Sequence, residues 1–142
     1  MSGLYEEIHL EGRGDFFMPY TPAIKVTGGS LVFVAGVTAA PVYHSHPHVA
    51  AEFDGIPDDP GRQADMAMDQ LEAVLEAAGT DLGHVVDLTR FIKDIDVNQD
   101  AINRAIGRRM GEHRPASTTV EVTRLATDPR LVLELRAVAV SP

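Results

Sequence analysis

The chain has 142 residues, 44% of them hydrophobic, with a formal net charge of -9 at pH 7 and no cysteine. This length suits one globular domain over residues 1–142, the negative charge disfavours a nucleic-acid backbone as partner, and the absence of cysteine excludes disulfides and thiolate metal sites. No apolar run is long enough to cross a bilayer, and the acidic N-terminus does not resemble a signal peptide. We therefore expect a cytoplasmic protein that binds neither nucleic acid nor a membrane.

The first third of the chain predicts short β-strands. A short N-terminal extension contains an edge strand at residues 8–10. Residues 23–27 and 30–37 then form two β-rich runs. The Gly28-Gly29 pair between them tolerates positive φ, so we predict a β-hairpin. The second run is almost continuously apolar, which is typical of a central strand covered on both faces.

An aromatic residue, Tyr20, lies in an extended loop between the first two of these strands. Pro19 and Pro22 fix that loop, since each proline restricts its own φ. The side chain of Tyr20 can pack with Phe16 and Phe17. Taken alone, the composition favours packing.

Residues 38–59 form an enlarged irregular loop that contains His44, His46 and His48. The alternation places the three imidazoles on one side of an extended chain, which is the arrangement that a metal ion requires of neighbouring ligands. Two other interpretations remain open. The histidines could line a cleft, with His46 as an acid or base, or the loop could simply be solvated. We expect no bound metal and no cofactor.

The second half of the chain predicts two helices and three strands. Asp59 and Pro60 are typical of the start of a helix, and Gly79 of its end. A second helix is expected from Asp96 or Asn98 to the residue before Gly111. The strands are expected at residues 84–95, 115–122 and 131–140. The order β-β-β-α-β-α-β-β predicts an α+β fold, with one mixed sheet and two helices on one face.

The strand at residues 115–122 has an unusual polar face. Ser117, Thr119 and Glu121 alternate with Thr118 and two valines, so one face of the strand is wholly polar. Burying such groups without partners costs roughly 2 to 7 kcal/mol each. We therefore expect this face to line a wet cleft or an interface.

Four segments of the chain resemble the RidA/YjgF family of enamine and imine deaminases. Residues 115–122 resemble the family's Pro-Ala-Arg-Ser-Thr-Val-Glu-Val. Residues 16–23 resemble its Gly-Pro-Tyr-Ser-Gln-Ala segment, whose tyrosine borders the active cleft, so the resemblance implies that Tyr20 borders a cleft. Residues 31–37 resemble Leu-Phe-Val-Ser-Gly-Gln, and residues 70–79 the family's first helix with its Leu-Glu-Ala-Ala-Gly ending. The resemblance extends over residues 19–140. It implies a chorismate-mutase-like α+β fold and a homotrimer with a cleft at each subunit boundary.

The resemblance also implies a mechanism, and two positions depart from it. In the family, an arginine binds the carboxylate of a small imino or enamino acid, and a glutamate positions water. Ser117 stands at the arginine position and Arg136 at the glutamate position. Either Arg136, oriented by Glu121, supplies the guanidinium that a carboxylate needs, or these two residues form a structural ion pair at the trimer interface. We favour the first interpretation.

The expected function is that of a divergent deaminase-like enzyme. Its substrate would be a small carboxylate-bearing imine, enamine or related metabolite, changed by water addition or proton transfer in an inter-subunit cleft. The alternative is a non-catalytic trimer that binds a small metabolite or stabilises other proteins. The candidate catalytic residues are Tyr20, His46, Glu121 and Arg136. The candidate substrate-binding residues are Ala35, Gly36, His44, His48, Arg90, Arg114, Ser117 and Thr119.

Overall fold

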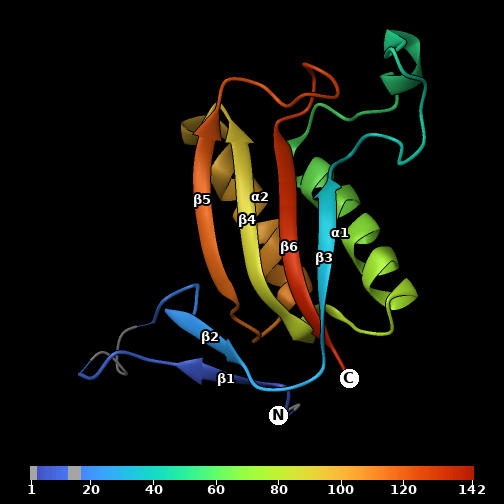
Figure 1. Ribbon diagram of the computed structural model, residues 1–142. Coiled ribbons are helices and arrows are strands. Elements are labelled where there is room, and N and C mark those ends of the chain that lie inside the picture. The colour runs from blue at the N-terminus through green and yellow to red at the C-terminus, as the bar shows by residue number, and fades with distance from the viewer. Residues whose placement is uncertain (1–2, 13–16) are drawn as a thin grey trace.

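The computed structural model describes residues 3–12 and 17–142. It has a four-stranded mixed sheet with the order β3-β6-β4-β5, in which β4 and β5 are parallel and β6 is antiparallel to both of its neighbours. Two helices cover one face of this sheet (Figure 1). The predicted α+β fold and element order are confirmed. The elements of this layer are β3 (Ser30–Val37), α1 (Pro60–Ala77), β4 (Val85–Lys93), α2 (Ile95–Met110), β5 (Ala116–Val122) and β6 (Leu133–Ser141).

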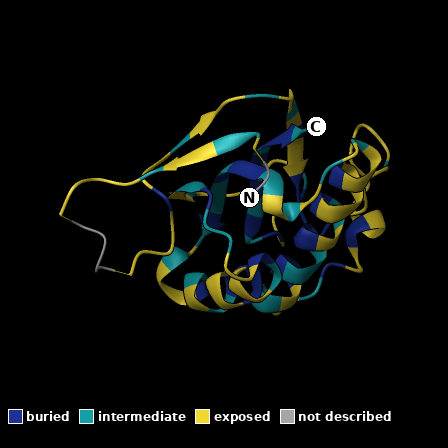
Figure 2. Cartoon of the chain, turned by 90° about the horizontal axis from the view of Figure 1, so that it is seen from below, coloured by how far each residue is buried: buried dark blue, intermediate teal, exposed yellow. Residues whose placement is uncertain are grey.

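The start of α1 and the ends of both helices lie at residues that the sequence marks. α2 begins at Ile95, before the predicted Asp96 or Asn98, and its N-cap residue Asp94 makes no side-chain capping hydrogen bond. The Asp59 carboxylate accepts a hydrogen bond from the Gly61 N–H (3.2 Å) at the start of α1. Gly79 and Gly111, just beyond α1 and α2, have positive φ values of 79° and 62°. The inward faces of the helices pack on the sheet, and Figure 2 shows the buried residues gathered between them. This layer is the main hydrophobic core. No helix among the described residues could span a bilayer.

The predicted hairpin is wrong. β2 (Ala23–Val26) pairs with β1 (Tyr5–Ile8) in a separate two-stranded sheet, whereas β3 pairs with β6. The first strand was predicted at residues 8–10, whereas β1 begins at Tyr5 and ends at Ile8. Gly29, with φ of 74°, approaches the end of β6 so closely that a Cβ there would lie 2.3 Å from the Ser141 carbonyl oxygen. The glycine pair thus carries the chain from one sheet to the other instead of folding it back.

The sheet has one open face, opposite the helices. β3 is an edge strand, so the prediction that it is central and covered on both faces is also wrong. Leu31 and Phe33, which alternate with buried positions of β3, are 52% and 69% exposed. β5 forms the other edge, with Val120 39% exposed. The apolar side chains on the open face of these edge strands are therefore not buried within the single chain.

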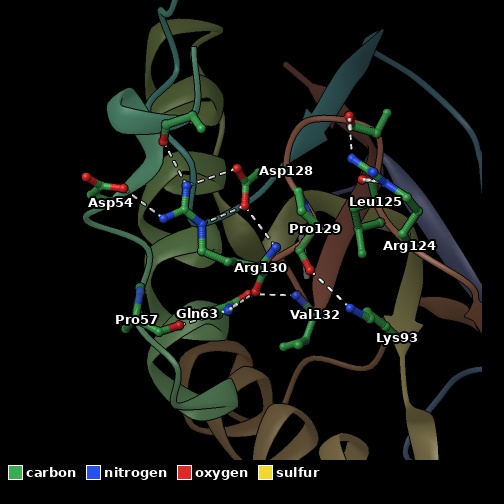
Figure 3. Close-up of polar contacts among 12 residues, drawn as sticks. Asp54, Pro57, Gln63, Lys93, Arg124, Leu125, Asp128, Pro129, Arg130 and Val132 are labelled. Carbon is green, nitrogen blue, oxygen red and sulfur yellow. Dashed lines mark hydrogen bonds and ion pairs between the residues drawn. The ribbon is translucent and has the colours of Figure 1, made fainter. Parts of the chain in front are cut away.

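A second, smaller core fixes the long loop of residues 38–59, which contains the short 3-10 helix η1 (Ala50–Phe53). Polar contacts add to it (Figure 3). The Arg130 guanidinium donates to the Asp54 carboxylate (2.9 Å), the Ala50 carbonyl (2.8 Å) and the Asp128 carboxylate (2.9 Å). These bonds tie the loop to the connection between β5 and β6. The apolar residues of this core are Ala39, Ala40, Phe53, Ile56, Leu125 and Leu131.

Substituting Arg130 tests this anchoring. The Arg130→Ala change leaves the Asp128 carboxylate without its main side-chain donor and removes the bonds to Asp54 and Ala50, so we expect the free energy of unfolding to fall measurably. Chemical denaturation measures the change. Arg124→Ala is the matched control, because Arg124 donates to the nearby Leu125 and Ala126 carbonyls and acts on Asp128 through a weaker Coulombic attraction, without a hydrogen bond to it. It should cost under about 0.5 kcal/mol. Equal effects of the two changes would contradict the anchoring role.

Asp128 also predicts a pH dependence of stability. The hydrogen bond from Arg130 holds the pKa of the Asp128 carboxyl below its ordinary value of 3.8. A depressed folded-state pKa contributes stability above the unfolded-state pKa and loses it as the pH falls through the folded value. Wild-type stability should therefore decline as the pH falls below about 4, and the decline should be shallower in Asp128→Asn. Parallel curves in thermal melts over this range would exclude the contribution.

Candidate functional site

A pocket of about 470 Å³ lies between the start of β5, the neighbouring β4 and the C-terminal half of α2. Segments far apart in the sequence meet there, including the residues just before β2 and the turn that precedes β5. Among the predicted site residues, the pocket lining includes Tyr20, Arg90, Arg114, Ser117 and Thr119.

Strand register explains why polar side chains point into this pocket. Ser117 pairs with Leu88, and Thr119 with Arg90, across the parallel strands β5 and β4. Leu88 is fully buried beneath the helices, and paired residues project to the same face of a sheet. The polar face predicted on β5 therefore faces α2 and lines a cleft.

The central feature of the pocket is the guanidinium of Arg90. Its Nη1 donates to the Ser117 hydroxyl oxygen, while its Nε is buried and has no hydrogen-bond partner among the described residues. Burial lowers the pKa of Arg90, because the charged form loses solvation. A guanidinium thus reaches the Ser117 position from the adjacent strand.

Hydrogen bonds hold Tyr20 at the mouth of the pocket. The next residue, Thr21, donates from its N–H to the Pro115 carbonyl (3.1 Å) and from its hydroxyl to the Arg114 carbonyl. Tyr20 itself is 38% exposed. Its predicted packing partner Phe16 lies outside the described residues, and Phe17 lies under the Arg114 guanidinium, 5.5 Å from its central carbon to the ring centre.

Arg114 lines the pocket but has backbone partners. Its Nη1 donates to the Gly111 carbonyl (2.6 Å), just beyond the end of α2. Cations at this end of a helix interact favourably with the helix dipole. Arg114 therefore stabilises the end of α2, and Arg90 is the arginine of the pocket with a buried, unpartnered donor.

The sequence analysis missed His113, which also lines the pocket. Its Nε2 lies 2.6 Å from the Val85 carbonyl oxygen. A carbonyl can only accept, so Nε2 carries the hydrogen and Nδ1 of the neutral ring can accept a proton. The only signal in the sequence was the position of His113, two residues before Pro115 and the polar strand. Its role depends on the fold that brings it beside β4.

The charge of the pocket differs from that of the whole protein. Its lining includes two arginines and a histidine, and no carboxylate among the described residues. The chain as a whole has a net charge of -9. This local excess of positive charge favours a small anion, such as a carboxylate.

The structure does not bring Arg136 and Glu121 together. Glu121 lies on the helix side of β5, where its Oε2 accepts from the Ile95 N–H (3.0 Å) at the start of α2. Arg136 is exposed and alternates with the buried Leu135 and Ala137 of β6, so it lies on the open face. Glu121 therefore does not orient Arg136 within the chain, and a contact between the two residues of different subunits stays a prediction. The two side chains project from opposite faces of the sheet, and the sequence alone does not show which face each of them occupies.

Gly36 and Ala35 also lie away from the pocket, on the edge strand β3 next to β6. The Glu134 carboxylate occupies the space beside Gly36, since a Cβ there would lie 2.0 Å from Glu134 Oε2. Burial raises the pKa of Glu134. Apart from Glu121 and the loop histidines, the predicted site residues therefore form two groups within one chain: those of the pocket, and Ala35 and Gly36 of β3 together with Arg136 of β6.

The three histidines of the long loop form a third group. Their ring centres are 4.8 to 5.1 Å apart, and one ring nitrogen of each lies within 4.8 Å of the others. The loop follows the end of β3 and lies beyond the end of the sheet opposite to the start of β5 (Figure 1). None of the three lines the pocket, so His46 is not placed beside Tyr20 and Arg90 within the chain.

Comparisons with known proteins identify the class to which this fold and pocket belong. The profile of the family described as endoribonuclease L-PSP matches residues 15–141. The chain therefore belongs to this family, which is the RidA/YjgF family of the resemblance above.

Individual relatives agree with this assignment. The chain is 34% identical over 121 residues to a RutC family protein of Pyrococcus abyssi, covering 85% of both chains. It is 35% identical over 86 residues to the 2-iminobutanoate/2-iminopropanoate deaminase of Escherichia coli K12, covering 58% of this chain and 66% of the deaminase. A crystal structure of E. coli TdcF with bound serine has a TM-score of 0.65 and 28% identity, covering 89% of this chain and 91% of that one. Membership supports a deaminase-like or endoribonuclease-like function.

Proposed function

We propose that the protein is a deaminase-type hydrolase that acts on a small imine or enamine carrying a carboxylate. The observation that carries this proposal is the Arg90 guanidinium in the pocket. It is bonded to Ser117 and has a buried Nε without a partner among the described residues. A buried cation without a compensating anion is costly. A bound carboxylate would satisfy the free donor and compensate the charge, as bidentate arginine–carboxylate pairs do.

The pocket supplies further groups that suit imine hydrolysis. With the carboxylate on Arg90, water adds to the C=N carbon while the nitrogen takes a proton. Loss of ammonia then forms the C=O bond and leaves a 2-oxo acid. Proton transfers of this kind need groups that both donate and accept. We assign them to the Tyr20 hydroxyl and to Nδ1 of His113, both of which belong to residues lining the pocket.

The relatives support a carboxylate-bearing ligand over RNA. One is described as a deaminase of 2-iminobutanoate and 2-iminopropanoate, and another has serine bound. Both 2-imino acids and serine are small molecules with one carboxylate. The net charge of -9 opposes an RNA backbone, and a pocket of about 470 Å³ suits a small molecule.

Moving the guanidinium from β4 to β5 tests whether Arg90 binds the substrate carboxylate. Arg90→Ser should lower kcat/KM for an amino-acid-derived imine roughly 10- to 100-fold, since hydrogen bonds to charged groups contribute about 1.5 to 3 kcal/mol. Ser117→Arg should also lower it, because two cations would share one pocket. The double change Arg90→Ser with Ser117→Arg restores the family arrangement and should recover most of the rate. The measurement is release of 2-oxo acid above the uncatalysed rate, from imines generated in the assay.

Arg108→Ser is the matched control, because the Arg108 side chain is 64% exposed and comes only within 4.0 Å of Asp65. It should leave kcat/KM unchanged. If Arg90→Ser keeps the wild-type rate, or if the double variant is no faster than Arg90→Ser, Arg90 does not bind the substrate carboxylate.

A non-catalytic binding protein is the second candidate, and the absence of a carboxylate from the described lining of the pocket favours it. Without an acidic residue, the described lining of the pocket lacks a carboxylate that could activate water. Calorimetric titration with serine separates the two functions. Binding that depends on Arg90, without any turnover of imines by the wild-type protein, would favour the binding function.

We further propose that the protein is a homotrimer in which the open sheet faces meet. Leu31 and Phe33 are 52% and 69% exposed on that face, and large apolar side chains gathered on one surface commonly mark an interface. The Ala35, Gly36 and Arg136 group of one subunit would then adjoin the pocket of the next. This arrangement would unite the two groups of predicted site residues in one cleft.

Light scattering measures the assembly directly. At micromolar concentration the mass should be three times that of one chain, and Phe33→Asp should shift it towards the monomer by placing a charge in the proposed interface. A wild-type protein that remains monomeric would refute the trimer. Leu10→Asp, at an exposed apolar residue outside the main sheet, is the control and should leave the mass unchanged.

A further inference from the structure

We propose that His44, His46 and His48 form a binding site for one divalent transition-metal ion. The sequence alone favoured no metal, because alternation along a chain does not show that side chains converge. The structure brings one ring nitrogen of each histidine within 4.8 Å of the others. A zinc ion bound at about 2.0 to 2.1 Å by tetrahedrally arranged nitrogens separates them by roughly 3.4 Å. Small rotations of the rings would close that difference.

A hydrogen bond to the backbone fixes the tautomer of His44. Its Nδ1 lies 2.8 Å from the Pro41 carbonyl oxygen. Because that oxygen can only accept, Nδ1 carries the hydrogen and Nε2 keeps its lone pair. A hydrogen bond from the second ring nitrogen to a backbone carbonyl is the usual support of a histidine that binds metal, since it fixes the tautomer and the ring orientation.

The backbone that carries the three rings is fixed as well. The Glu52 carboxylate accepts from the Ser45 N–H (3.1 Å) and the Ser45 hydroxyl (3.2 Å), so η1 ties down the residue between two of the histidines. The fully buried Phe53 lies beneath the group, with its ring centre 5.0 Å from that of His44 and 5.6 Å from that of His48. The network around Arg130 anchors η1 in turn. The site is therefore built on an anchored loop.

The ligand set indicates the class of ion. Three imidazoles without thiolates suit zinc, cobalt, nickel or copper, whereas magnesium and calcium require oxygen ligands. Three protein ligands leave a fourth position for water or another ligand. His46 and His48 are exposed, so an ion can enter from solvent. The site lies apart from the Arg90 pocket and does not depend on the function proposed for it.

Zinc titration of the full chain, after removal of metal with a chelator, tests the site. Calorimetry should give one zinc per chain, zinc should raise the melting temperature, and magnesium should do neither. His46→Ala and His48→Gln should each weaken zinc binding by at least about 10-fold, the scale of effect seen when support of a metal site is removed. His9→Ala, which changes an exposed histidine outside the group, should bind zinc as the wild type does.

Cobalt provides a readout of geometry. Four-coordinate cobalt bound by three imidazoles and water should give intense visible absorption, which His46→Ala should abolish while circular dichroism stays unchanged. Weak binding of zinc that is equal in the wild type, His46→Ala and His9→Ala would overturn the proposal. So would a stoichiometry well below one ion per chain.

Discussion

The architecture depends on one constraint: two helices can cover only one face of a four-stranded sheet. Strand alternation then decides the environment of every residue in the sheet. Side chains on one face form the core with α1 and α2, and those on the other face remain exposed in the single chain. Where the covered face reaches the edge strand β5, the core gives way to polar residues and a pocket. The open face is apolar along β3.

The pocket illustrates how a charge can be kept while its position in the sequence changes. Ser117 is too short to bind a carboxylate as a guanidinium does. The parallel pairing of β4 and β5 brings Arg90 to the same face, where it donates to Ser117. In register, Arg90 lies beside Thr119, two positions further along β5. A side chain as long as arginine can span that offset, so the strand that carries the cation can differ while the pocket remains cationic.

The long loop of residues 38–59 is held in place without the strand pairing that orders the sheet. It has no regular strand, yet a small apolar cluster and the bonds of Arg130 fix it to the connection before β6. A loop anchored in this way can hold side chains in a defined arrangement at little cost in conformational entropy. His44, His46 and His48 lie on this anchored loop, which is found beyond the end of the sheet opposite to the start of β5 (Figure 1), and none of them lines the pocket.

Local chemistry made much of the fold predictable. Helix caps such as Asp59 and Gly111 act within a few residues of the chain, and the periodicity of apolar residues marks helices and strands without knowledge of the fold. The resemblance in the segment around Ser117 identified the family, which the comparisons confirm. Tyr20, Arg90 and Ser117 were named as candidates from the sequence, and the fold places all three around one pocket.

What the sequence alone left undecided are the relations between distant segments. It could not show that β2 pairs with β1 and not with β3, because a pair of glycines permits either a hairpin turn or a connection between two different sheets. It could not separate Glu121 from Arg136, since the face of a side chain depends on strand pairing and on which face the helices cover. The convergence of three histidines likewise requires a loop anchored by residues about 80 positions away. The sequence determined most of the helices and strands and the candidate site residues. Tertiary packing decided which of these residues lie close together, because proximity across a sheet or a loop depends on contacts between distant segments that no local pattern encodes.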